Sequence, residues 1–299
     1  MNPNFLVAGV AKCGTTSLYY YLEQHPQVCI PKKETFFFIA DRYKTPPVDE
    51  RGRRDPARII ATRPAYDQLY SVCKDGAVGE VSTCYVFYYK EAIPKIKATL
   101  GDPAILIVIR QPVERLFSGY KHFLRMEKED LSLDEALAAE IKRGQAGWDF
   151  MWQYTGLGFY ADAIEAYQQN FSKVKVILQE DLTDHAEATM KEIFQFIGVD
   201  DNFVPDTSTR YNISDPQTKN VWFRYFFRNK IARKYLKPLV MSFITESTKR
   251  KIMHSFRKPN KQAAVKLDDK KRNELLTLYK SDILRIEKLT GRNLNHWLK

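Results

Sequence analysis

Short runs rich in apolar residues recur along the chain, and each is bounded by charged or turn-forming positions. Runs of this kind predict buried β-strands. They lie at 5–10, 77–81, 104–109 and 174–178. Stretches with apolar residues at helical spacing alternate with them, at 16–25, 88–98, 112–129 and 183–197. This alternation predicts an α/β fold in which helices cover both faces of a parallel β-sheet.

Two segments interrupt the alternation. Residues 41–64 are charged, contain four prolines and have no clear period. They predict a long loop or lid, or a solvated insertion without a function of its own. The composition of residues 205–262 predicts a basic helical segment. Because 299 residues suffice for one large domain with its own core, we expect residues 1–299 to form a single domain that includes both segments.

The positive charge is concentrated in residues 219–261. This segment holds thirteen Lys or Arg residues against one acid, Glu246, in a chain whose formal net charge is +11. It also carries aromatic residues, among them Trp222, Phe223, Tyr225, Phe226, Phe227 and Tyr235. Such a stretch suits an anionic membrane surface, an acidic acceptor, or the border of an anionic cofactor, and these interpretations stay open. We expect no nucleic acid as partner, because no recognised nucleic-acid module accompanies the segment.

The cysteine residues and the lengths of the apolar stretches indicate in which cellular compartment the protein is expected. Cys13, Cys29, Cys73 and Cys84 show neither metal-ligand spacing nor the density of a disulfide scaffold, which favours a reducing cytoplasm. No stretch reaches the roughly 18 apolar residues that a transmembrane helix needs, and the first ten residues lack the charged start of a secretion signal. We therefore expect a cytoplasmic protein, peripheral at a membrane surface if the basic segment binds lipid.

The most informative stretch is FLVAGVAKCGTTSL, residues 5–18. A buried strand runs into a glycine-containing turn and then into a helix that Thr15 or Thr16 is expected to cap. Glycines at 9 and 14 let the backbone curl, so that consecutive N–H groups and the positive end of the helix point at one spot. The pattern predicts a phosphate-binding loop.

The order of residues in this loop differs from that of a Walker A loop, in which lysine follows the second glycine. Gly9 and Gly14 have the Walker spacing, but Thr15 stands in the lysine position and Lys12 lies two residues before Gly14. The strand at 104–109 ends in Arg110, where a magnesium-dependent nucleotidase usually has an aspartate. The loop therefore predicts phosphate binding without ATP and magnesium.

A second motif occupies residues 105–123, where a buried strand leads through Pro112 at a helix start into an amphipathic helix. Arg110 ends the strand and Ser118 follows eight residues later. Arg115 lies three positions before Ser118, hence on the same side of the helix. An arginine fork and a hydroxyl at a helix N-terminus suit a dianionic phosphate.

These motifs resemble those of the sulfotransferases that use 3′-phosphoadenosine 5′-phosphosulfate (PAPS). K-x-G-T-T after a strand is similar to their 5′-phosphosulfate loop, and Arg110 with Ser118 is similar to their 3′-phosphate motif. Three more stretches extend the resemblance to the heparan-sulfate, Golgi-like and bacterial branch: PKKETFFF at 31–38, GEVSTCY at 79–85, and the closing helix with its G-R-N-L-x-x-W tail at 275–297. Thr83 replaces the usual proline of the second stretch.

The resemblance implies a P-loop-like fold and PAPS as cofactor, with adenosine 3′,5′-bisphosphate (PAP) as product and no metal. The implied cofactor-binding residues are Lys12, Cys13, Gly14, Thr15, Thr16, Ser17, Arg110, Ser118, Arg257 and Lys258. Arg257 and Lys258 resemble a pair that returns to the 3′-phosphate, but Pro259 stands where glycine is usual, so these two residues equally suit a simple extension of the basic segment.

The implied reaction is in-line transfer of a sulfuryl group from PAPS to an acceptor hydroxyl, on a carbohydrate or glycolipid. Lys12 is the residue expected to stabilise the leaving phosphate, because its charge is favoured most when negative charge develops there. Glu34 of the K-E segment is the candidate general base, and His122 is the competing base on the helix after Ser118.

Two other classes of function remain open. A P-loop kinase of a small hydroxylated substrate shares the strand–loop–helix core, and Gln179-Glu180-Asp181 after the strand at 174–178 offers it a magnesium ligand. A non-enzymatic protein that binds polyanions or membranes would rest on residues 219–261 alone. Both phosphate motifs favour the sulfotransferase.

Overall fold

The computed structural model describes residues 1–44, 52, 54, 59–208 and 265–299. Five parallel strands form its central sheet, in the order β2-β3-β1-β4-β5. They are β1 (Phe5–Gly9), β2 (Val28–Cys29), β3 (Ala77–Val81), β4 (Ala104–Ile109) and β5 (Val174–Leu178). The predicted α/β class and the four predicted strands are confirmed. The sequence did not predict β2, because two residues are too few to show a pattern.

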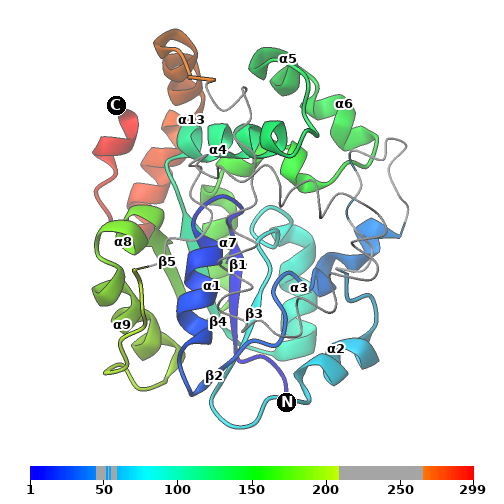
Figure 1. The fold of residues 1–299 in the computed structure, drawn as a ribbon, viewed down its shortest axis with the longest axis vertical. Helices are drawn as coiled ribbons and strands as arrows, with labels where there is room; N and C mark the ends of the chain where they lie inside the picture. Colours follow the sequence, from blue (N-terminus) through cyan, green and yellow to red (C-terminus); the bar gives the residue numbers. More distant parts are fainter. Residues whose placement is uncertain (45–51, 53, 55–58, 209–264) are drawn as a thin grey trace, which may run out of the picture.

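Every residue of β1, β3 and β4 is buried, because helices cover both faces of the sheet. Burial on both faces explains the nearly continuous apolar sequence of β4. The connection through α1 (Thr15–Glu23) lies on one face, and those through α3 (Tyr89–Leu100) and α7 (Ala161–Asn170) lie on the other (Figure 1). This two-sided arrangement is the one that right-handed crossovers produce, because the connection from β1 to β2 runs in one direction along the sheet and those from β3 to β4 and from β4 to β5 run in the other.

The remaining described helices frame the sheet. They are α2 (Arg63–Tyr70), α4 (Pro112–Arg125), α5 (Leu133–Ala138), α6 (Glu140–Gln145), α8 (Gln179–Asp184), α9 (Ala186–Ile197) and α13 (Asp269–Thr290), with 3₁₀ turns at Phe37–Tyr43, Phe150–Trp152, Gly156–Gly158 and Asn295–Leu298. The helix predicted at 183–197 is in fact two helices, because His185 has non-helical angles between α8 and α9. The predicted closing helix is α13.

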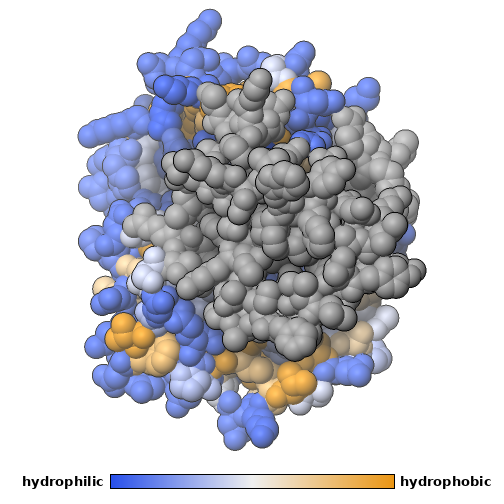
Figure 2. Space-filling model, viewed as in Figure 1, coloured by the Kyte–Doolittle hydropathy of each residue, from blue (hydrophilic) through white to orange (hydrophobic). Residues whose placement is uncertain are grey.

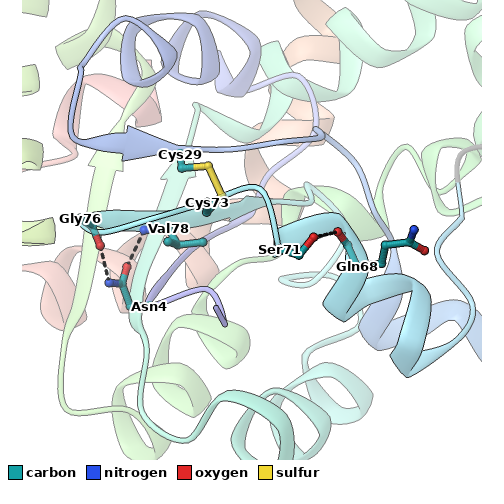
Figure 3. Close-up of a disulfide and its surroundings, with 7 residues drawn as sticks. All are labelled: Asn4, Cys29, Gln68, Ser71, Cys73, Gly76 and Val78. Carbon is teal, nitrogen blue, oxygen red and sulfur yellow. Dashed lines mark hydrogen bonds between the residues drawn. A yellow bond between two sulfur atoms is a disulfide. The ribbon is translucent and has the colours of Figure 1, made fainter.

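The four cysteines behave differently from one another. Cys29 of β2 and Cys73, which lies between α2 and β3, form a disulfide (Figure 3), whereas Cys13 and Cys84 are free and buried. The low cysteine density gave no sign of this bond, since the two residues are 44 positions apart. Disulfides are rare in a reducing cytosol. The bond therefore removes the support that the cysteines lent to a cytoplasmic location, which stays a prediction.

Two predicted segments fall largely or wholly beyond the described residues. Of 41–64, the structure describes 41–44, 52, 54 and 59–64, whereas the basic segment 219–261 lies entirely outside the described residues.

Hydrophilic residues dominate the described surface in Figure 2, and apolar ones gather toward its lower end. Within the described part of the chain, no helix combines the length and apolarity needed to cross a membrane.

All five strands are parallel, so their carboxyl ends meet at one edge of the sheet. In open parallel sheets this edge is where ligands bind. Here the loop after β1, the segment that pairs with the end of β3, and the start of α4 after β4 all come together at this edge.

Candidate active site

A cavity of about 860 Å³ opens at the carboxyl edge of the sheet. It is lined from the loop after β1, from the K-E segment, from α4, from the 149–152 turn and from α8. Nine residues that the sequence singled out meet in its walls: Lys12, Gly14, Thr15, Thr16, Ser17, Glu34, Arg110, Ser118 and His122. Residues from both phosphate motifs and both candidate bases therefore line one cavity.

The loop after β1 presents backbone N–H groups to this cavity. Gly14 is the N-cap of α1 and has left-handed angles, with φ at 90°, which a glycine adopts without strain. The expectation that Thr15 or Thr16 caps the helix is wrong, because no side chain caps it and Thr15 is already helical. The first N–H groups of an α-helix have no partner within the helix and attract an anion together with the helix dipole.

Cys13 lies beneath this loop rather than in the cavity wall. Its side chain is completely buried, and burial raises the pKa of the thiol to about 12. Its backbone N–H donates to the carbonyl of Val10 over 3.2 Å. A thiol with a raised pKa stays protonated and is a poor nucleophile, so Cys13 fills space under the loop.

Arg110 and Ser118 approach the cavity from the end of β4 and from α4. Tyr160 donates to the carbonyl of Arg110 over 3.0 Å, which fixes the backbone at the strand end. Gln111 caps α4 by accepting a hydrogen bond from the N–H of Glu114 at 2.7 Å. The guanidinium of Arg110 also lies 3.6 Å from Glu114, so its charge is oriented before any ligand binds.

Arg115 does not join them, and its assignment to the phosphate is wrong. Although Arg115 and Ser118 are three positions apart, Arg115 is completely buried and donates to the carbonyl of Tyr154. Residues three apart differ by about 60° around the helix axis. This rotation is sufficient to place Arg115 on the core side of α4 while Ser118 faces the cavity.

Glu34 lines the cavity from the K-E segment. Its backbone has φ at 65°, and its N–H donates to the carbonyl of Val81 at the end of β3 over 2.7 Å. Its carboxylate accepts a hydrogen bond from Thr83 Oγ1, at 3.0 Å from Oε1 and 3.3 Å from Oε2. Lys33 Nζ lies 3.9 Å from the same carboxylate. The side chain of Glu34 is 16% exposed, so it is accessible from the cavity yet held in place.

His122 lines the cavity from α4, one turn after Ser118. Its ring lies 5.7 Å from the ring of Phe123. Both candidate bases therefore reach the cavity, but they belong to different walls. Of the two, Glu34 is hydrogen-bonded to the edge of the sheet through its backbone. It follows Lys33, which contacts the phosphate loop at Thr16.

A buried polar cluster behind Glu34 supports this wall. Glu80 is completely buried and accepts hydrogen bonds from the hydroxyls of Thr35, Tyr66, Tyr85 and Ser82. Burial raises the pKa of Glu80 above its ordinary value. Ser82 Oγ in turn accepts from the N–H of Thr35 at 3.1 Å. The sequence signalled this cluster only as part of a motif, and its role beneath the candidate base was not predicted.

Comparison with known proteins identifies the family. The model of the sulfotransferase family matches residues 3–203, more than half of the chain. The chain belongs to this family. A solved sulfotransferase from Alicyclobacillus acidocaldarius is 30% identical and superposes with a TM-score of 0.75, covering 100% of both chains. The resemblance that the motifs indicated is thus confirmed, and so is the fold class.

Curated relatives match over shorter stretches. Heparan sulfate glucosamine 3-O-sulfotransferase 3A1 of Mus musculus is 25% identical over 200 residues, which are 66% of this chain and 46% of that one. The membrane-associated sulfotransferase kil1 of Dictyostelium discoideum is 30% identical over 131 residues, 44% of this chain and 25% of that one. The chain thus spans between a quarter and about half of the length of these relatives.

One part of the cavity wall combines aromatic rings with a buried ion pair. Arg54 bonds Asp149 twice, at 2.5 and 2.8 Å, and its guanidinium lies 4.0 Å from the ring centre of Phe36. Phe150 and Trp152 line the same side. Arg54 lies inside the segment that the sequence treated as a lid, and its pairing with a residue 95 positions away could not be predicted.

The carboxylates that a kinase would need are engaged elsewhere in this sulfotransferase. Asp181 bonds the guanidinium of Arg292 at 2.7 and 2.9 Å, and Glu180 accepts from Trp297 Nε1 at 2.7 Å and contacts His296. Residues of the C-terminal tail thus bind both carboxylates.

In the described parts of the chain, no group of three or more His, Cys, Asp or Glu residues is arranged to hold a metal ion. Arg257 and Lys258 lie outside the described residues.

Proposed function

We propose that this sulfotransferase transfers a sulfuryl group from PAPS to an acceptor hydroxyl. The observation that carries the proposal is that the phosphate loop with Lys12 and the carboxylate of Glu34 line one cavity. In-line transfer needs a donor site on one side of the sulfur and a proton acceptor on the other. A single cavity lined by both groups supports this arrangement.

The residues of the cavity fit a donor with two separate phosphate groups. The first N–H groups of α1 and the hydroxyls of Thr15, Thr16 and Ser17 suit the 5′-phosphate. Arg110 and Ser118 suit the dianionic 3′-phosphate through charged and neutral hydrogen bonds. When bound, PAPS supplies an activated sulfuryl group on a phosphate leaving group. We propose that this transfer requires no metal.

Two side chains carry the chemistry of the proposal. Lys12 places a positive charge on the turn before Gly14, where negative charge develops on the departing phosphate. Glu34 accepts the proton of the acceptor hydroxyl at its carboxylate, which Thr83 holds in a fixed orientation.

We propose a carbohydrate, free or on a glycolipid, as acceptor. Two observations support it. A relative is named for sulfating the glucosamine of heparan sulfate, and the cavity wall contains Phe150 and Trp152 together with the Arg54–Asp149 pair. Aromatic faces beside hydrogen-bonding charges suit a ring that is apolar on its faces and polar at its rim.

The same proposal includes a cytoplasmic location, with residues 219–261 contacting an anionic membrane surface and no nucleic-acid partner. Its support is the composition of that segment alone. Vesicle co-sedimentation that falls steeply with salt would favour membrane contact.

Calorimetry with PAP, adenosine 5′-phosphate and ATP with magnesium tests the cofactor. We expect PAP to bind in the presence of EDTA and the other two to bind much more weakly. Equal affinity for PAP and adenosine 5′-phosphate, or binding only with magnesium, would contradict the proposal. A screen of ³⁵S-labelled PAPS against sugars, glycolipids and simple phenols then identifies the acceptor.

A further inference from the structure

Lys33 connects the phosphate loop to the candidate base. Its Nζ donates a hydrogen bond to Thr16 Oγ1 over 2.7 Å and lies 3.9 Å from Glu34 Oε1. Thr16 belongs to the first turn of α1, at the phosphate loop, whereas Glu34 belongs to the segment that bonds the end of β3. The ammonium group of Lys33 therefore lies between the loop and the candidate base.

The local backbone explains why neighbouring residues share this cavity. Lys33 forms a parallel bridge with Val81 at the end of β3, which fixes its main chain at the sheet edge. Successive side chains of an extended strand point to opposite faces. The left-handed φ of 65° at Glu34 breaks that alternation, and both Lys33 and Glu34 line the cavity. The hydroxyl cluster around Glu80 holds Thr35, the next residue, in place.

We propose that Lys33 is a second catalytic lysine, which contacts the sulfuryl group during its transfer; this inference rests on the proposed function. In the reaction a bond forms between the acceptor oxygen and sulfur while the bond from sulfur to the phosphate oxygen breaks. The electron pair stays on that phosphate oxygen, and the acceptor proton passes to Glu34. Lys33 remains protonated throughout.

The position of Lys33 gives it a role different from that of Lys12. The sulfur of an in-line transfer lies between the leaving phosphate and the acceptor oxygen, hence between the loop and Glu34. An ammonium has three N–H donors, so a bond to Thr16 is compatible with a second bond to a sulfuryl oxygen. In this arrangement Lys33 stabilises the negative charge on the non-bridging sulfuryl oxygens, and Lys12 stabilises the charge that develops on the leaving phosphate oxygen.

The test compares Lys33→Met and Lys33→Arg with the matched control Lys32→Met, whose side chain is not part of the cavity wall. PAPS turnover is followed as PAP release, with water as acceptor and with the best sugar of the screen. We expect Lys33→Met to lower turnover roughly 10- to 100-fold, as for the loss of a charged hydrogen bond. Affinity for PAP, which lacks the sulfuryl group, should stay near wild type. Lys33→Arg should restore part of the rate, and Lys32→Met should behave as wild type.

A double-mutant cycle separates catalysis from support of the loop. If Lys33 only positions Thr16, Lys33→Met should cost nothing further in a Thr16→Ala background. That result, or an equal loss of PAP affinity and turnover in Lys33→Met, would overturn the inference. A wild-type enzyme that consumes PAPS beside an unimpaired Lys33→Met variant would overturn this inference alone. A wild-type enzyme that neither binds PAP nor consumes PAPS would overturn the proposed function as well.

Discussion

Thr83 Oγ1 donates a hydrogen bond to Glu34 Oε1 over 3.0 Å, from the position where the G-E-x-S-P-x-Y motif usually has proline. Thr83 is 5% exposed, so the bond is shielded from water. Proline has no side-chain donor, and the apparent departure from the motif therefore adds a contact. It ties the carboxylate of the candidate base to the end of β3.

Thr83→Val should lower kcat roughly tenfold or more while PAP affinity stays unchanged. Valine keeps the shape of threonine but removes the hydroxyl, and a hydrogen bond to a charged group contributes roughly 1.5–3 kcal/mol. Steady-state kinetics at saturating PAPS measure the effect. Thr83→Ser, which keeps the hydroxyl, is the control. Equal turnover in the valine and serine variants would show that the bond does not serve catalysis.

Glu34→Gln should lower kcat by roughly 10²–10⁴, the usual range for the loss of a general base. Glutamine retains hydrogen bonding but cannot take the proton of the acceptor, so PAP affinity should stay near wild type. Lys12→Ala should lower kcat with some loss of PAPS binding as well, because its charge is expected to contact the phosphosulfate.

His122→Asn is the comparison that identifies the base. With Glu34 as base, we expect this variant to keep most of its turnover and to lose stability instead. Turnover and thermal unfolding are measured on the same preparations. A folded His122→Asn variant without activity, beside an active Glu34→Gln variant, would assign the base to His122.

The sheet and the phosphate loop could be predicted because both are local in sequence. Strands buried on two faces leave apolar runs, and a loop that must present N–H groups needs glycine at a fixed position, here Gly14. Sequence spacing alone did not predict which side chains of α4 point into the core and which point into the cavity. Arg115 has the spacing expected for a residue on the same face as Ser118, yet its side chain is buried on the core side of the helix.

Contacts between distant residues could not be predicted from one sequence. The Cys29–Cys73 bond, the Arg54–Asp149 pair and the bonds of Glu80 with Thr35 and Tyr66 join residues whose proximity depends on the finished fold. None of them has a local pattern. The Arg54–Asp149 pair lies in the cavity wall and the hydroxyls around Glu80 support Glu34, whereas the disulfide lies toward the amino end of β3. Under the proposed function, the specificity for the acceptor resides in the cavity wall.

Arg110→Ala should weaken PAP binding roughly 10- to 100-fold, because a charged hydrogen bond contributes roughly 1.5–3 kcal/mol. Ser118→Ala should cost less, since it removes one neutral donor. Affinity for adenosine 5′-phosphate should change little in either variant, because that nucleotide lacks the 3′-phosphate. Calorimetry with both nucleotides checks this. Unchanged PAP affinity in Arg110→Ala would remove this arginine from the 3′-phosphate site.

Cys73→Ser should lower the free energy of unfolding by roughly 2–4 kcal/mol, as expected for opening a covalent loop of 44 residues. Turnover at low temperature should be unchanged, because Cys29 pairs with Val78 near the amino end of β3 and the cavity lies at its carboxyl end. Denaturant unfolding of wild type, with and without dithiothreitol, provides the comparison. A reductant that leaves the wild-type midpoint unchanged would contradict the expected stabilisation.

Glu80 should make the stability of the enzyme depend on pH. Burial raises its pKa in the folded state above the value of an exposed glutamate, about 4.5, so folding favours the protonated acid. The stabilisation is therefore complete below the unfolded pKa and is lost as pH rises through the folded pKa. Within that window each pH unit costs about 1.4 kcal/mol.

Glu80→Gln has no carboxyl group to titrate and isolates this contribution. The difference in unfolding free energy between wild type and Glu80→Gln should fall as pH rises from about 4.5, then level off above the folded pKa. Denaturant unfolding of both proteins at a series of pH values measures it, and groups shared by the two proteins cancel. A difference that grows with pH would mean that the four hydroxyls stabilise the carboxylate more than burial destabilises it, which would reverse the assigned direction of the pKa.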